Sequence, residues 1–136
     1  MSDKDLRFNS LTIHGGQKHE EATGAVMPPI FQTSTYAQTH PGGHKGFEYS
    51  RTQNPTRMAL ENSIASIEGG GFGLAFGSGL AAIDAVIKML EPGDEVISTN
   101  DLYGGTYRLF TKIFSKYGIK FHFTGMADAS TVKDKV

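Results

Sequence analysis

The chain has 136 residues, of which 38% are apolar and 20% are charged, so its composition is that of a folded globular domain. Thirteen basic and fourteen acidic residues give a formal net charge of -1, which excludes a general attraction to nucleic acid or to an anionic membrane surface. Cysteine is absent, which excludes disulfides and thiolate chemistry, and no apolar run is long enough for a membrane helix, so we expect a cytoplasmic protein.

Residues 1–54 show no sustained helical or strand periodicity, and turn-forming pairs such as Gly15-Gly16 interrupt them. The stretch is too long for an ordinary loop. It nevertheless carries large apolar side chains, among them Ile30 and Phe31. We therefore expect residues 1–54 to be an extended N-terminal arm that packs against another surface, such as a neighbouring subunit.

From residue 55 onward, helical and extended patterns alternate. Pro55 suits the first turn of a helix, which is predicted over 55–67 and ends in a run of three glycines. The pattern then predicts a buried strand at 72–76 and a helix from 79 to about 90, with Leu80 and Ile83 on its apolar face. A strand at 95–99 and a loop at 100–105 follow. The last part is predicted to be a helix at 107–117 with Phe110, Ile113 and Phe114 inward, a left-handed Gly118 and a strand at 120–124. Asp128 is predicted to cap a further helix.

This order of strand, helix, strand, helix and strand predicts an α/β fold with an open, mostly parallel sheet. Ligands of such sheets bind at the carboxyl ends of the strands. The expected ligand segments are therefore 77–80, 100–105 and 125–128.

The first of these segments contains a glycine turn, Gly-Ser-Gly-Leu-Ala-Ala at 77–82. The glycines allow close approach of a ligand to the backbone, and the free amides at the start of the following helix favour a phosphate. The same letters also fit a dinucleotide-binding turn, with Asp101 near the end of the next strand as the ribose partner. A tight structural turn is the third possibility, and the turn alone does not decide among the three.

A second motif lies upstream, Phe-Glu-Tyr-Ser-Arg-Thr-Gln-Asn-Pro-Thr-Arg at 47–57. Arg51 offers a planar fork of donors that matches phosphate oxygens, and Tyr49 adds a neutral donor beside it. Taken alone, the position of Arg51 favours a surface arginine near a turn over a phosphate ligand. A dinucleotide-binding fold begins with its first strand, so the long preceding segment disfavours that alternative.

These two motifs, followed by Leu-Tyr-Gly-Gly-Thr at 102–106, resemble the Cys/Met-metabolism family of pyridoxal phosphate (PLP) enzymes, which includes cystathionine gamma-synthase, cystathionine gamma-lyase and methionine gamma-lyase. The resemblance implies the PLP-transferase fold type I. Residues 1–54 would then be an arm reaching a neighbouring subunit, and residues 55–136 the N-terminal part of the large PLP-binding domain. The chain corresponds only to the N-terminal portion of a family member.

The resemblance also implies residue roles. The amides of Gly79 and Leu80, in the turn that contains Ser78, would hold the cofactor phosphate. Tyr49 and Arg51 would hold the same phosphate from a neighbouring subunit, so a homodimer or homotetramer is implied.

Three further side chains acquire roles from the resemblance. Tyr103 would stack on the pyridine ring and take part in acid–base catalysis, although a half-buried loop tyrosine fits its position equally well. Glu48 and Arg108 match positions that contact the distal end of the substrate in cystathionine-handling members, although Arg108 is also typical of a solvated helix face. Gly105 stands where methionine gamma-lyases often carry cysteine, which favours cystathionine chemistry.

In the family, the reacting lysine and the acid beside the pyridine nitrogen follow later in the chain, so residues 1–136 alone are expected to be inactive. Lys112 follows a threonine as the family lysine does, but its helical context predicts a surface residue. The histidines lack metal-ligand spacing, so no metal is predicted. His122 alternates with Phe121 and Phe123 and is therefore expected on the opposite side of its strand.

For the intact protein the resemblance implies gamma-replacement or gamma-elimination on sulfur amino acids, with cystathionine or O-acylhomoserine as substrate. A methionine gamma-lyase or homocysteine synthase is the alternative within the family. A non-catalytic dinucleotide- or phosphate-binding Rossmann-like module is the alternative outside it.

Overall fold

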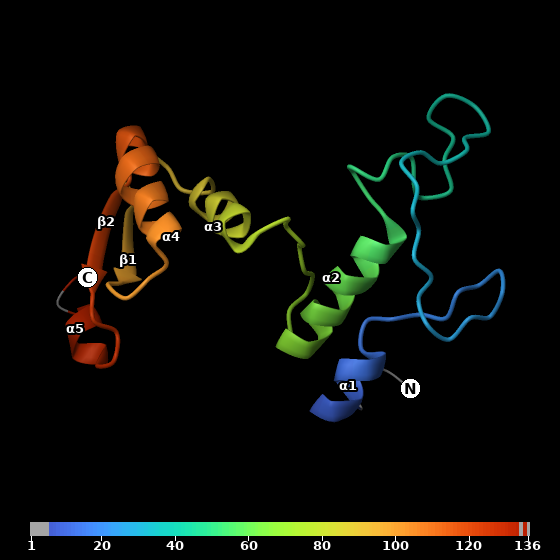
Figure 1. The fold of residues 1–136 in the computed structure, drawn as a ribbon, viewed down its shortest axis with the longest axis horizontal. Helices are drawn as coiled ribbons and strands as arrows, with labels where there is room; N and C mark the ends of the chain where they lie inside the picture. The colour runs from blue at the N-terminus through green and yellow to red at the C-terminus, as the bar shows by residue number, and fades with distance from the viewer. Residues whose placement is uncertain (1–5, 134, 136) are drawn as a thin grey trace. The chain divides into compact units, whose positions relative to one another are not determined.

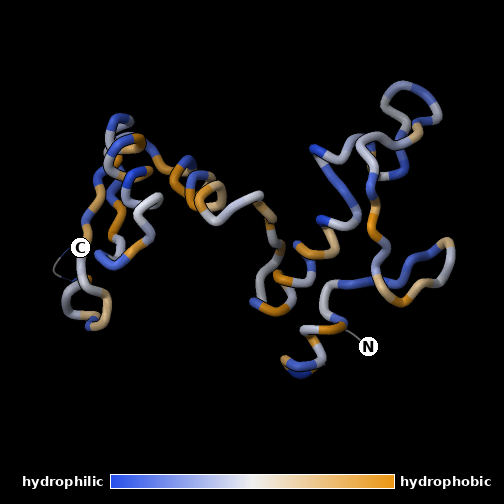
Figure 2. Tube along the Cα trace, in the orientation of Figure 1, coloured by the Kyte–Doolittle hydropathy of each residue, from blue (hydrophilic) through white to orange (hydrophobic). Residues whose placement is uncertain are grey.

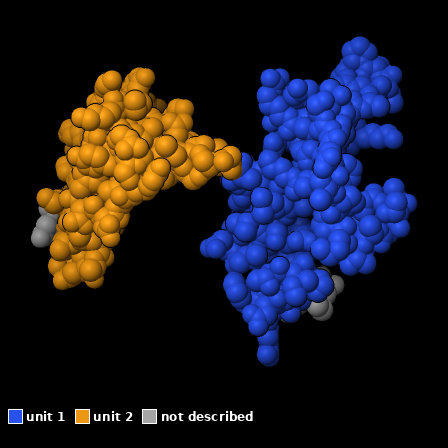
Figure 3. Space-filling view, viewed as in Figure 1, with its two compact units in different colours: residues 1–75 blue, residues 76–136 orange. Residues whose placement is uncertain are grey.

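The computed structural model describes residues 6–133 and 135, and Figure 1 shows their course. The chain forms two compact units, residues 1–75 and residues 76–136, which Figure 3 draws in different colours. The predicted division into an arm of residues 1–54 and a domain that begins at residue 55 depends on a neighbouring subunit, so it stays a prediction.

The first unit contains two helices, α1 (Phe8–His14) and α2 (Pro55–Glu68), which pack against each other. The chain leaves α1 through Gly16, which has a φ of +67°. A Cβ on Gly16 would lie 2.3 Å from the carbonyl oxygen of Asn62 in α2, so only glycine fits this crossing. Helix α1 was not predicted, because residues 1–54 show no sustained helical period. Its seven residues are too few to produce a recognisable period.

Helix α2 confirms the predicted helix at 55–67 and extends it by one residue. The Asn54 side chain caps it by accepting hydrogen bonds from the amides of Thr56 (2.9 Å) and Arg57 (3.4 Å), and Pro55 occupies the first turn. Gly69 ends the helix in the left-handed conformation.

The second unit contains α3 (Gly79–Ile87), β1 (Glu95–Thr99), β2 (Lys120–Thr124) and α5 (Ala129–Lys133). The helical connection between the strands is α4 (Gly104–Arg108), the π-helical turn η2 (Leu109–Ile113) and the 3₁₀ turn η3 (Phe114–Tyr117). The two strands pair in parallel, from Glu95 opposite Lys120 to Thr99 opposite Thr124. The predicted strands at 95–99 and 120–124, their parallel pairing and the left-handed Gly118, with a φ of +83°, are confirmed.

An apolar core holds this unit together. Ile87 of α3, Phe110 and Phe114 of the helical connection, and Ile119 before β2 are each 5% exposed. Phe110 stacks on Phe121 of β2, with ring centroids 4.5 Å apart. Apolar and polar residues alternate along β2, as Figure 2 shows. The two phenylalanines of the strand, Phe121 and Phe123, pack against the core.

The structure corrects three predictions made for residues 72–117. No strand forms at 72–76: Phe72 is 81% exposed, and the described residues of this segment pair with no strand. The amide of Ala75 donates to the carboxylate of Glu61 rather than to a neighbouring strand. The helical connection begins at Gly104, within the predicted loop. Ile113, predicted inward, is 45% exposed because η2 changes the angle per residue.

Candidate functional site

The glycine turn leads into α3, and Ser78 is the N-cap of that helix. The Ser78 hydroxyl accepts from the amide of Ala81 at 3.1 Å, and its carbonyl accepts from the amide of Ala82 at 3.1 Å. Within the described part of the chain, the amides of Gly79 and Leu80 donate to no group. The start of α3 therefore presents two free N–H groups at the positive end of its dipole.

The glycines of this turn are not explained by the chain's own conformation. Neither Gly77 nor Gly79 has a positive φ, and a Cβ built on either would meet no atom within 4 Å. Backbone strain and packing within the chain thus permit larger residues at both positions. Glycines at both positions leave the backbone open to close approach of a group from outside the chain, and amides without a partner among the described residues are suitable donors for a phosphate, so the residues present fit the PLP phosphate.

Tyr103 is the residue immediately before α4, and its side chain is 72% exposed. Its carbonyl accepts from the amide of Tyr107 at 3.1 Å, which fixes the backbone of the residue at the start of the helix. The ring lies against buried Gly105, where an added Cβ would approach the ring carbon Cε1 to 2.3 Å. Tyr103 thus presents an accessible aromatic face and hydroxyl, as stacking on a flat ligand requires.

Tyr49 and Arg51 lie together on one turn of the first unit. The Arg51 guanidinium lies over the Tyr49 ring, 5.1 Å from its centroid, and both side chains are exposed. The Tyr49 backbone pairs with Thr35 in an isolated antiparallel bridge, and its carbonyl accepts from the amides of Thr52 and Gln53. The turn therefore presents one cation and one phenol side by side.

Glu48 and Arg108 are both exposed, and neither forms an ion pair with another described residue. Glu48 belongs to the unit of residues 1–75 and Arg108 to the unit of residues 76–136. The same division separates Tyr49 and Arg51 from the glycine turn and Tyr103. The structure brings together Tyr49 with Arg51, and Ser78 with the free amides of Gly79 and Leu80.

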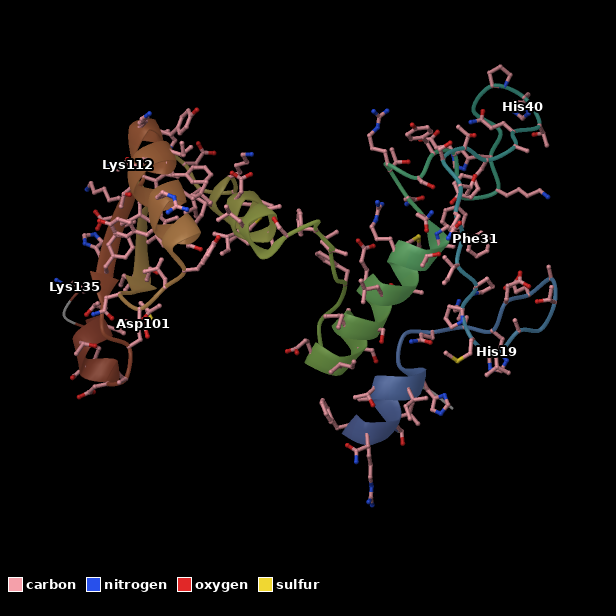
Figure 4. All side chains as sticks on the ribbon, viewed as in Figure 1. His19, Phe31, His40, Asp101, Lys112 and Lys135 are labelled. Atoms are coloured by element: carbon pink, nitrogen blue, oxygen red, sulfur yellow. The ribbon has the colours of Figure 1, made fainter. Side chains whose placement is uncertain are left out.

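Sequence reasoning missed the polar network behind the Tyr49–Arg51 turn. The Asn54 amide group donates to the Phe31 carbonyl (3.1 Å) and the Ser50 hydroxyl (3.0 Å), and Arg57 donates to two backbone carbonyls of the turn. Phe31, labelled in Figure 4, makes a second contact with the start of α2: its backbone amide donates to the Thr56 hydroxyl at 2.8 Å. The only signal in the sequence was an asparagine immediately before a helix-starting proline.

The remaining predicted side chains have ordinary surroundings. Lys112 is exposed and stands out from η2 in Figure 4, as expected of a surface residue. His122 faces away from the phenylalanines and pairs with Glu95, with Nε2 and Oε2 2.7 Å apart. Within the described ranges, no three His, Cys, Asp or Glu side chains are grouped to hold a metal ion, and no helix has the length and apolar character to cross a membrane.

The chain belongs to the Cys/Met metabolism PLP-dependent enzyme family, whose model matches residues 9–136. This places the three motifs in a family of PLP enzymes and removes the dinucleotide-binding alternative. The family resemblance, the type of fold and the cofactor expected from the sequence are thereby confirmed.

Among its relatives, the chain is 46% identical to a cystathionine beta-lyase of Coxiella burnetii, and the match covers 99% of the chain and 35% of the relative. It is 50% identical to a probable cystathionine gamma-synthase of Herpetosiphon aurantiacus, over 95% of the chain and 40% of the relative. The crystal structure of metB from Corynebacterium glutamicum superposes with a TM-score of 0.91 at 36% identity, over 100% of the chain and 36% of that structure. The chain therefore spans little more than a third of the length of these relatives.

Proposed function

We propose that residues 1–136 are the N-terminal portion of a PLP-dependent transsulfuration enzyme that catalyses gamma-replacement or gamma-elimination on sulfur amino acids. The observation that carries the proposal is the start of α3, where Ser78 caps the helix and the amides of Gly79 and Leu80 have no partner among the described residues. The chain's own conformation requires glycine at neither 77 nor 79. When bound, PLP supplies an electron sink that stabilises carbanions on the amino-acid substrate.

In this proposal, the chain's own residues bind the cofactor and move one proton. Gly79 and Leu80 donate their amides to the phosphate, and Ser78 has its hydroxyl proton available for a third hydrogen bond. Tyr103 lies against the cofactor ring and exchanges a proton at its hydroxyl with the substrate amino group. The lysine that binds the cofactor covalently is not among residues 1–136, so this portion alone is inactive.

Tyr49 and Arg51 complete the phosphate site from a neighbouring subunit, which makes the protein a homodimer or a pair of homodimers. The exposed side chains of the arm support this: Val26, Met27 and Ile30 are 67%, 75% and 77% exposed, which is typical of a surface that another part of an assembly covers. The relatives named above act in amino-acid metabolism, and a cytoplasmic location is part of the same proposal.

Glu48 and Arg108 are proposed to bind the distal amino-acid end of the substrate, through its ammonium and carboxylate groups respectively. Both side chains are exposed and unpaired among the described residues, so both are available. Gly105 leaves no side chain beside Tyr103, which favours a longer substrate such as cystathionine over methionine. O-acylhomoserine lacks the distal amino-acid group. Its turnover is therefore expected to be the least affected when Glu48 or Arg108 is removed.

The test of the phosphate site is Gly79→Ala in the full-length protein, with Gly71→Ala as the matched control. A Cβ on either glycine meets no atom within 4 Å, and neither has a positive φ, so both variants should fold normally. We expect Gly79→Ala to raise the Kd of PLP roughly tenfold, the cost of about one charge-assisted hydrogen bond. The same variant should leave the Kd of pyridoxal, which lacks the phosphate, within about twofold of the parent. Equal weakening of both ligands would refute a phosphate site at this turn.

The contribution from a second subunit is tested by mixing two defective variants, Arg51→Ala and Tyr103→Phe, and allowing subunits to exchange. If Arg51 acts in the neighbour's site, each mixed dimer contains one site with both defects and one site with neither. Activity should then rise above that of either variant alone. If Arg51 acts in its own subunit's site, every site keeps a defect and mixing restores nothing.

A further inference from the structure

Arg57, on the first turn of α2, contacts the backbone on both sides of Arg51 through its side chain. Its Nη1 donates to the carbonyl of Ser50 at 3.1 Å, and its Nη2 donates to the carbonyl of Thr52 at 2.6 Å. These carbonyls belong to the residues immediately before and after Arg51. One guanidinium therefore holds the backbone on both sides of the arginine that the proposed function places on the phosphate.

The guanidinium of Arg57 is itself held by its third nitrogen. Its Nε lies 3.5 Å from Oε1 of Glu61, one turn further along α2, and the Glu61 side chain is only 14% exposed. The same carboxylate oxygen accepts from the amide of Ala75 at 2.9 Å, so its position is fixed from two sides. The planar fork of arginine can satisfy two carbonyls and a carboxylate together, whereas the ammonium of lysine has no such fixed geometry.

The two arginines of this segment face different surroundings. Arg57 uses its donors on the protein, and its side chain is 34% exposed. Arg51 is exposed and, among the described residues, contacts only the ring of Tyr49 through its guanidinium. Arg51 thus keeps its hydrogen-bond donors for an external anion, while Arg57 fixes the backbone that carries Arg51.

We propose that Arg57 is a positioning residue for the cofactor phosphate, acting through Arg51 by holding the carbonyls of Ser50 and Thr52. The proposal rests on the proposed function, because it requires that Arg51 binds that phosphate. It assigns to the second arginine of the segment a role that requires no contact with the ligand. Because a held backbone limits the directions available to the Arg51 side chain, less entropy is lost when the phosphate binds.

The experiment compares Arg57→Ala, Arg51→Ala and the double variant in the full-length protein, with PLP and pyridoxal as the two probes. We expect Arg57→Ala to raise the Kd of PLP roughly tenfold and that of pyridoxal less than about twofold, since only PLP engages Arg51. In the Arg51→Ala background, Arg57→Ala should add less than about twofold, because residues that act through one another are not additive. Arg57→Lys should recover only a minor part of the PLP affinity, because one ammonium cannot replace the fork.

Hydrogen exchange separates failure of this proposal from failure of the proposed function. Arg57→Ala should speed exchange of the amides at 50–53 in the cofactor-free protein, whether or not Arg51 binds phosphate. Unchanged exchange, equal weakening of both probes, or full additivity with Arg51→Ala would each overturn the positioning role. Arg51→Ala without effect on PLP, together with faster exchange in Arg57→Ala, would instead refute the phosphate role of Arg51 and with it this proposal. Lys88→Ala, which removes the exposed Lys88–Asp84 pair of α3, is the control and should change none of these readouts.

Discussion

The two compact units of this chain are stabilised by different kinds of contact. Residues 76–136 surround an apolar core in which Ile87 and Phe110 are each 5% exposed. In residues 1–75, the turn that carries Arg51 is held by hydrogen bonds from Asn54 and Arg57 to backbone and hydroxyl oxygens. The apolar stripe of α2 lies open to solvent, with Leu60 and Ile64 54% and 49% exposed.

This difference matches the tasks proposed for the two units. A glycine turn that presents backbone amides needs a rigid helix behind it, and an apolar core supplies that rigidity through α3. A segment that presents Tyr49 and Arg51 to a neighbouring subunit must fix its backbone while leaving its apolar side chains available for the interface. Polar side chains that hold backbone carbonyls can satisfy both requirements.

The largest effect is expected in the apolar core, where Phe110→Ala removes the ring that stacks on Phe121. A buried phenylalanine replaced by alanine typically costs about 3–5 kcal/mol of unfolding free energy. We expect a loss of that size in urea denaturation of the full-length protein, because Phe110 is central to the contacts of η2 with β2. Tyr117→Ala, on η3 but 65% exposed, is the matched control and should cost less than about 1 kcal/mol. A loss of less than about 1 kcal/mol for Phe110→Ala would contradict the role of this core in stability.

The same core explains which parts of the fold could be predicted from sequence. Phe110, Phe114 and the alternating residues of β2 follow helical and strand periods, so the strands and the helical region between them were predicted. The period fails within η2, where a π-helical turn moves Ile113 to the surface. Helix α1 was missed because its seven residues bury none of their side chains.

The candidate site, too, could be predicted from the sequence only in part. The glycine turn is a contiguous motif with a physical mechanism, and the free amides at Gly79 and Leu80 are where that mechanism places them. The network of Asn54 and Arg57 joins residues up to twenty-three positions apart through backbone carbonyls. Backbone carbonyls are present at every residue, so no residue pattern identifies those that accept these bonds. The role proposed for Arg51 rests on the family resemblance rather than on any period in the sequence.

An intermediate effect is expected at Asn54, the centre of the polar network in residues 1–75. Asn54→Ala removes the cap of α2 and the donor to Phe31 and Ser50, and we expect a cost of about 2 kcal/mol in unfolding free energy, at the upper end for a lost cap. Asn54→Asp keeps the acceptor for the Thr56 amide but loses the donors. It should therefore preserve the exchange protection of the first amides of α2 while speeding exchange in the turn at 49–53. Loss of protection at both places in Asn54→Asp would contradict this division of roles.

The smallest effect is expected at the exposed cluster on the outer side of the strand pair. The Glu95 carboxylate accepts from Lys120 at 2.8 Å and contacts His122 at 2.7 Å. The hydrogen bond from Lys120, followed by that from His122, lowers the pKa of Glu95 below its ordinary value of 4.5, and Glu95 in turn raises the pKa of Lys120 above 10.5. A carboxyl whose pKa is lower in the folded state adds stability above its unfolded pKa and loses it as the pH falls through the folded pKa.

The unfolding free energies of the parent and Glu95→Gln should therefore differ by a constant amount at neutral pH and converge as the pH is lowered from 4.5. The contribution of Lys120 is complete below pH 10.5 and is lost as the pH rises through its raised folded pKa. Curves for parent and variant that stay parallel throughout acid titration would contradict the role of Glu95.

Salt sharpens the comparison of the two units, because each contains a glutamate whose pKa is lowered below its ordinary value. In residues 1–75, the pKa of Glu20 is lowered by hydrogen bonds from the Thr23 hydroxyl and the amides of Ala22 and Thr23, with no cation among its causes. The pKa of Glu95 is lowered by a cation that lies in solvent and is screened by salt. Raising the salt concentration from about 0.01 M to 1 M should therefore move the measured pKa of Glu95 toward its ordinary value while changing that of Glu20 less. Equal salt sensitivity of the two glutamates would show that charge contributes no more to the outer face of the strand pair than it does to the turn at residues 20–23.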